Sequence, residues 1–76
     1  MKFLQIAIPN EKKILKECKY LNQSIVENVS FMGFYKDRIL KVNFKVNSTE
    51  YLVEYSCPTK RLYTLFVRKL RRLCDF

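Results

Sequence analysis

The last residues of the chain, KRLYTLFVRKLRRLCDF, have the clearest chemical capability. They hold six of the fifteen positive charges, and Asp75 is the single acid among them. Four of the six cations are arginines, whose planar guanidinium matches phosphate oxygens better than a lysine ammonium does. No acid lies four residues from these charges along the helix body to offset their repulsion. The pattern predicts a phosphate-binding surface formed by Lys60, Arg61, Arg68, Lys69, Arg71 and Arg72.

Residues suited to catalysis or metal binding are scarce. The chain has no histidine, so neither a Ser-His nor a Cys-His nucleophile pair can form, and its seven acids are scattered. A single glycine excludes a glycine-rich loop for nucleotide phosphates. Cys18, Cys57 and Cys74 form no CxxC pair, which favours small buried side chains in a reducing compartment over a zinc site. We therefore expect no enzymatic activity, no catalytic residues, no cofactor and no metal.

The composition describes a small, basic, folded chain. Seventy-six residues suit a single domain, residues 1–76, near the lower size at which a hydrophobic core is sufficient. The formal net charge of +8 favours polyanionic partners such as nucleic acid, an acidic protein or an anionic membrane surface. No stretch approaches the roughly 20 apolar residues of a membrane span, and the start MKFLQIAIP is too short for a secretion signal. These features predict a cytoplasmic protein.

The C-terminal cations need a helix to gather them on one side. At 100° per residue, residues 60–74 place all six on one half of a helix, with Leu65 near the boundary. Pro58 suits the first turn of this helix, with Cys57 or Thr59 as its cap. The opposite, apolar half is predicted to pack on a core; it consists of Leu62, Tyr63, Phe66, Val67, Leu70, Leu73 and Cys74.

The N-terminal half predicts a strand, a helix and a second strand. Residues 2–8 read as a short strand that ends at Pro9. Asn10 can then cap an amphipathic helix whose apolar stripe contains Ile14, Leu15, Cys18 and Leu21. Residues 24–35 are rich in β-branched and aromatic side chains, which favours a strand with a bulge at Gly33.

A β-hairpin is the most regular pattern in the chain. Residues 38–46 and 51–57 alternate between apolar and polar side chains on either side of a polar turn at residues 47–50. The resulting order is β-α-β-β-β-α. It predicts an α+β fold in which a small antiparallel sheet of three to four strands carries two helices packed on one face.

Further cations and a few aromatic side chains extend the predicted binding surface. Lys41 and Lys45 lie on the outer side of the hairpin and are included among the candidate nucleic-acid-binding residues. Tyr20, Phe34 and Tyr35 are the aromatic side chains left over from the core, and each is expected in the core or at its boundary. The surface therefore favours contacts to the phosphate backbone over base reading.

Two resemblances to known families accompany this pattern. The order helix, three strands, helix resembles double-stranded RNA-binding domains, which implies phosphate contacts near the start of the last helix, at Lys60 and Arg61. That family's Gly- and Ala-rich last helix and histidine-containing loop are missing here. Residues 30–66 resemble the KTSC domain, found alone and at the end of some lysyl-tRNA synthetases. The matching residues are Gly33, Leu40, Val42, Phe44, Tyr55, Pro58 and Tyr63, while Val53 replaces the first tyrosine of the family's central motif.

Three functions remain open at this point. Nucleic-acid binding, to RNA or DNA, is favoured by the arginine-rich strip. The alternative is a protein–protein interaction module that docks on an acidic surface, for example a viral or mobile-element inhibitor, a source that the Lys, Asn, Ile and Tyr bias suits. Membrane-surface attachment would need the apolar half of the last helix, which so short a chain needs for its core. Homodimerisation through the free edge of the N-terminal strand is compatible with each.

Overall fold

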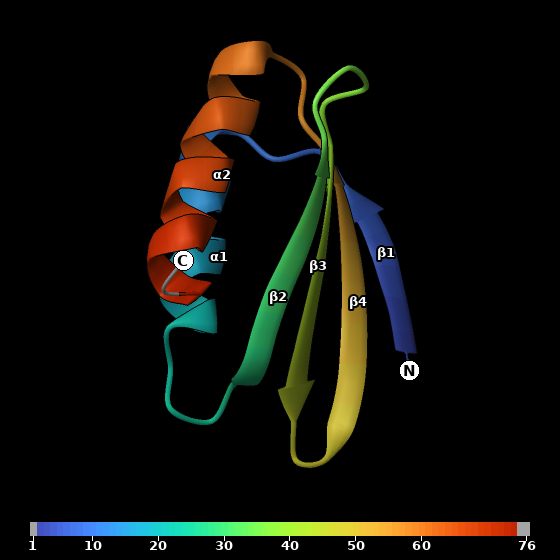
Figure 1. The fold of residues 1–76 in the computed structure, drawn as a ribbon, viewed down its shortest axis with the longest axis vertical. Helices are drawn as coiled ribbons and strands as arrows, with labels where there is room; N and C mark the ends of the chain where they lie inside the picture. Colours follow the sequence, from blue (N-terminus) through green and yellow to red (C-terminus); the bar gives the residue numbers. More distant parts are fainter. Residues whose placement is uncertain (1, 75–76) are drawn as a thin grey trace.

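A four-stranded sheet forms one layer of the molecule, and two helices form the other (Figure 1). The computed structural model describes the backbone of residues 2–74 and the side chains of residues 6–74. The α+β class and the order β-α-β-β-β-α predicted from the sequence are confirmed. The elements are β1 (Lys2–Ala7), α1 (Glu11–Leu21), β2 (Glu27–Phe34), β3 (Ile39–Val46), β4 (Thr49–Ser56) and α2 (Lys60–Cys74).

The sheet has the strand order β1-β4-β3-β2 and is mixed. β2, β3 and β4 are antiparallel neighbours as expected, but β1 pairs in parallel with β4. Chain direction explains the difference. α1 returns the chain to the end of the sheet where β1 began, so β2 runs the same way as β1, and two hairpins make β4 run that way too. Either outer position in the β2-β3-β4 sheet would therefore have made β1 parallel to its neighbour.

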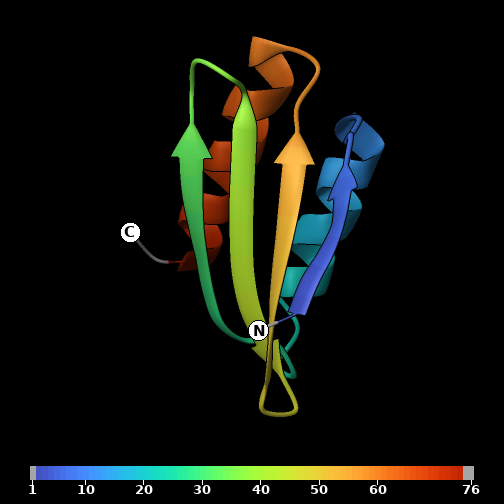
Figure 2. The same cartoon turned by 90° about the vertical axis from the view of Figure 1, so that its right-hand side faces the viewer.

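Both helices cover the same face of the sheet and enclose the core. β3 and β4 contribute alternate residues to it, of which Leu40, Val42 and Tyr55 are almost completely buried. α1 contributes Ile14 and Leu21. Because the side chains of a strand alternate between faces, the intervening residues of β3 and β4 lie on the face that no helix covers. Figure 2 shows this uncovered face toward the viewer, with both helices behind it.

The helix starts follow local sequence signals, with one correction. The Asn10 side chain accepts a hydrogen bond of 2.8 Å from the Lys13 backbone N–H, which confirms it as the cap of α1. Thr59 caps α2, because its hydroxyl accepts from the Leu62 backbone N–H at 3.2 Å. The prediction of Pro58 in the first turn of α2 was wrong: Thr59 caps the helix, so Pro58 precedes it.

Gly33 has a different role from the bulge predicted there. The irregularity in the β2–β3 ladder lies between Glu27 and Ser30, where Asn28 adopts a φ of 55°. Gly33 is regularly paired with Leu40, and a Cβ atom at its position would collide with the Tyr63 hydroxyl. The glycine therefore makes room for α2 to approach the sheet closely.

Candidate nucleic-acid interface

α2 is held to the sheet by its apolar half. Leu62, Tyr63, Phe66 and Leu70 are buried, and the Phe66 ring packs edge-to-face on Tyr55 of β4 with centroids 4.8 Å apart. This confirms the division of the helix made from the sequence. Five of its six cations are exposed, and Lys69 is half-buried. The apolar half is therefore committed to the core, and the other half faces solvent.

The positive charge of the protein is concentrated in the helical layer. α1 and α2 together carry ten basic and two acidic residues, whereas the rest of the chain carries five of each. One of the two acids, Glu17, is half-buried and accepts a hydrogen bond of 2.7 Å from the Tyr55 hydroxyl. Of the acids within α1 and α2, Glu11 alone then lies on the outer side of the layer. The formal charge of +8 is thus carried by the two helices rather than spread over the whole chain.

The two helices lie side by side and run in the same direction. One hollow near their N-terminal ends is lined by Glu11 and by the first turns of α2, and another is lined by the end of α1 and by Lys69 and Arg72. We call their outward surface the cationic helical face. It consists of Lys12, Lys16 and Lys19 of α1 with Lys60, Arg61, Arg68, Lys69, Arg71 and Arg72 of α2.

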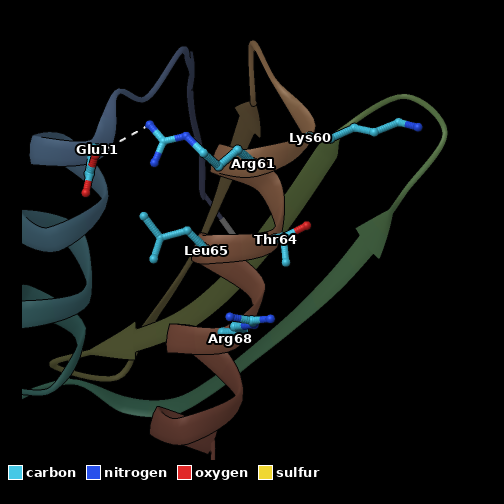
Figure 3. A pocket seen from close by; sticks show the side chains of 6 residues that line it. All are labelled: Glu11, Lys60, Arg61, Thr64, Leu65 and Arg68. Carbon is cyan, nitrogen blue, oxygen red and sulfur yellow. Dashed lines mark ion pairs between the residues drawn. The ribbon is translucent and has the colours of Figure 1, made fainter.

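The first hollow has a volume of about 480 Å³ and is open to solvent (Figure 3). Leu65 separates Arg61 from Arg68, and Arg61 extends across the gap toward α1. Its Nη2 lies 3.5 Å from Oε2 of Glu11, the one ion pair among the described side chains. Both side chains are exposed, so the pair contributes at most about 1 kcal/mol to stability. Glu11 therefore competes locally with any anion for Arg61.

The second hollow brings Lys19 of α1 together with Lys69 and Arg72 of α2. Cys18 lies beneath them, and burial raises the pKa of its thiol from 9.0 to about 11, although the nearby Lys69 ammonium acts in the opposite direction. The thiol is therefore protonated at neutral pH and is a poor nucleophile. Because three cations line this hollow, it is chemically suited to bind an anion.

The opposite flank of α2 carries Lys60 beside an aromatic pair. The Lys60 ammonium lies 5.5 Å from the centre of the Tyr35 ring, which packs edge-to-face on Tyr63. Two hydrogen bonds hold this region: the Cys57 N–H donates to the Arg38 carbonyl at 2.9 Å, and Arg38 Nε donates to the Cys57 carbonyl at 3.2 Å. They fix the turn that carries Tyr35 against the start of α2.

Lys41 and Lys45 do not join the α2 cations. Both belong to the alternate set of β3 residues that face away from the helices, paired in register with Glu54 and Glu50 of β4. The sheet lies between them and α2. One nucleic-acid segment bound along α2 could not reach them, so the predicted eight-residue set divides into two groups on opposite faces.

The leftover aromatic side chains lie at the surface or the core boundary. Tyr35 is 55% exposed, and Tyr20 and Phe34 are about 40% exposed. Tyr20 packs edge-to-face on Phe44, and Phe34 lies under the Lys41 ammonium on the sheet face. Among these rings, Tyr35 is the one next to an α2 cation, so no row of stacking rings follows the cationic helical face.

Within residues 2–74, no three side chains of the His, Cys, Asp and Glu types are grouped to hold a metal ion. Neither helix is long and apolar enough to cross a bilayer.

Sequence reasoning missed two features of this surface. Glu11 lies in the first turn of α1, where an acid is favourable, but its pairing with Arg61 depends on how the helices dock. Lys19 lies outside the apolar stripe of α1, but its place beside Lys69 and Arg72 depends on the parallel direction of the helices. The periodicity of each helix was the available signal. It predicts the side of the helix on which a residue lies, but not the residues of other elements that lie beside it.

Comparison with protein-family models, with curated proteins and with solved structures found no match to this chain.

Proposed function

We propose that this protein binds nucleic acid through the phosphate backbone, using the cationic helical face. The observation that carries the proposal is the segregation of charge: the net positive charge lies on two neighbouring helices, and the remainder of the chain is balanced. A surface of this kind releases condensed counterions from a polyanion, which supplies most of the affinity in backbone recognition.

The make-up of the face favours phosphate contacts over base reading. Arginines supply four of the six α2 cations, and their forked donors fit phosphate oxygens in pairs. The few exposed rings do not form a stacking row, which argues against specific recognition of unstacked bases. Duplex RNA is the first ligand to test because of the topological resemblance to double-stranded RNA-binding domains.

The test is fluorescence anisotropy with short duplex RNA, duplex DNA and single-stranded RNA of equal length at several salt concentrations. If the six α2 cations engage a DNA duplex, log K should fall with log salt at a slope of about −5. The Arg68→Glu/Arg72→Glu variant should bind about 10-fold to 100-fold more weakly, since it removes two phosphate contacts and adds repulsion.

A matched control is available on the opposite face. Lys41→Glu/Lys45→Glu lowers the formal net charge by the same amount as Arg68→Glu/Arg72→Glu but leaves the cationic helical face intact. It should retain most of the affinity for a duplex short enough to occupy one face. Equal losses in the two variants would show that net charge, not the helical face, determines binding. Lack of binding to all three ligands at low salt would overturn the proposal.

An acidic protein partner is the second candidate, and one observation favours it. Leu15 of α1 is 48% exposed at the edge of the second hollow, beside Lys19. Protein interfaces use apolar anchors surrounded by polar contacts, whereas phosphate contacts do not need them. Leu15→Ser should weaken a protein partner strongly and a nucleic acid little, as measured by titration of each ligand.

A further inference from the structure

The uncovered face of the sheet is mixed in character, unlike the helical face. Met32 and Phe34 of β2 are 60% and 40% exposed there, and Leu52 of β4 is half-buried. Met32 and Leu52 border a shallow hollow of about 360 Å³ that Lys41 and Asn43 also line. An apolar centre with charged neighbours is typical of protein interfaces rather than of a solvated sheet.

The charges on this face form a regular pattern across β3 and β4. In the antiparallel register, Lys41 is paired with Glu54 and Lys45 with Glu50, so within this pair of strands the lysines lie on β3 and the glutamates on β4. Among the described side chains, none of the four forms an ion pair within 4.0 Å. These four charges are therefore neutral in sum but divided into a positive strand and a negative strand, and Glu27 of β2, which is paired with Lys45, adds one negative charge beside them.

We propose that a second copy of this chain docks on the uncovered sheet face and forms a symmetric dimer. The register determines the symmetry axis. Consider a two-fold axis that lies between the two packed sheets, runs parallel to the strands and passes midway between β3 and β4. It places β3 of one copy over β4 of the other, and every residue keeps its position along the strand direction. Lys41 then faces Glu54 of the second copy and Lys45 faces its Glu50, and the same contacts recur on the other side of the axis.

The alternative axis is electrostatically unfavourable. A two-fold axis perpendicular to the strands places β3 over β3, so that lysines face lysines and glutamates face glutamates. Docking through the helical layer is excluded by its net positive charge on both copies. The free edges of β1 and β2 remain available for backbone pairing, but β2 is irregular at Asn28.

The size of the face is sufficient for a modest dimer. The face has three strands of eight residues and one of six, about 4.8 Å apart and rising about 3.3 Å per residue, which gives roughly 500 Å² per copy. Two such faces bury roughly 1,000 Å², the lower limit for a specific interface and the size class of weak, transient complexes. Aligned sheets pack with their strands within about 30°, so residues near the axis keep the pairing described above.

The test uses sedimentation equilibrium of the free protein from about 10 μM to 500 μM, a range that includes micromolar dissociation constants. The wild type should dimerise. Lys41→Glu and Glu54→Lys should each weaken the dimer by about 10-fold or more, because each replaces two attractive contacts by repulsive ones. Circular dichroism confirms that each variant is folded. Arg68→Glu, on the helical face, serves as the control and should not weaken the dimer.

Mixing the two single variants gives the decisive result. In a mixed dimer with the proposed axis, the glutamate introduced at position 41 of one chain faces the lysine introduced at position 54 of the other. Across the axis, the native Lys41 and Glu54 face each other, so all contacts are attractive again. An equimolar mixture should associate at least as tightly as the wild type, although each variant alone does not.

Two results would overturn the proposal: a monomeric wild type, or a mixture that associates no more tightly than the separate variants. No nucleic acid is present in this experiment, so its outcome is independent of the proposed function.

Such a dimer would carry one cationic helical face on each of its two outer surfaces, pointing in opposite directions. If the proposed function is also correct, one dimer could hold two nucleic-acid segments at once. Native gel electrophoresis with two differently labelled duplexes would then detect bridging by the wild type and its loss in Lys41→Glu.

Discussion

The Tyr55 hydroxyl of β4 donates a hydrogen bond of 2.7 Å to Oε2 of Glu17 in α1. It links the centre of the sheet to the helix and directs one of the two acids of the helical layer inward. Tyr55 itself is almost completely buried, and its ring packs on Phe66 of α2. One side chain therefore contacts both helices.

The Tyr55→Phe variant should lower the free energy of unfolding by about 1–3 kcal/mol. It retains the ring packing but leaves the half-buried Glu17 carboxylate without its donor, and hydrogen bonds to charged groups have this magnitude. Urea unfolding of the variant and the wild type measures the difference. Tyr51→Phe is the control, since no hydrogen bond of its hydroxyl is present among the described residues. Equal stability of Tyr55→Phe and wild type would contradict a structural role for this bond.

Stability should decrease in alkaline solution. Burial, and next the hydrogen bond to Glu17, raise the pKa of Tyr55 well above its ordinary 10.0, and burial raises the pKa of Cys18 from 9.0 to about 11. The folded state therefore holds these protons more tightly than the unfolded chain does. The contribution of these two groups to the free energy of unfolding is complete below about pH 9, and it is lost progressively as the pH rises above 9. Urea unfolding at several pH values tests this, and Cys18→Ala should flatten the curve between about pH 9 and pH 11.

Substitution of Gly33 by alanine should destabilise the protein by about 1–3 kcal/mol. The new Cβ atom would collide with the Tyr63 hydroxyl and touch Leu40 in the core. Removing the obstacle should rescue the variant, so the Gly33→Ala/Tyr63→Phe double variant is expected to recover part of the loss. Thermal unfolding of the two single variants and the double variant completes the cycle. Strictly additive effects would show that the collision is not the cause.

Neutralising Glu11 should strengthen nucleic-acid binding if the proposed function is correct. Glu11→Gln releases Arg61 from its only described ion pair and removes the one acid of α1 and α2 that lies on the outer side of the helical layer. We expect a severalfold higher affinity, since Arg61 no longer has to leave Glu11 before it contacts a phosphate. Glu50→Gln makes the same change in net charge on the sheet face and is the control. Equal gains in both variants would attribute the effect to net charge alone.

The order of elements, the hairpin and the two faces of α2 follow from the sequence by itself. They are local properties: alternation specifies a strand, a spacing near 3.6 specifies a helix face, and Asn10 and Thr59 mark helix starts through their own side chains. For the same reason, helical periodicity alone places the six cations of α2 on one half of the helix. The nucleic-acid function assigned to them stays a prediction.

Tertiary structure alone decided which of these surfaces meet. The parallel β1–β4 pair, the approach of Tyr63 to Gly33 and the ion pair between Glu11 and Arg61 all join residues far apart in the chain. Lys41 and Arg68 are both outward-facing cations by periodicity, yet the sheet lies between them. Periodicity describes each element about its own axis, whereas the side on which an element docks depends on burying apolar area across the whole fold.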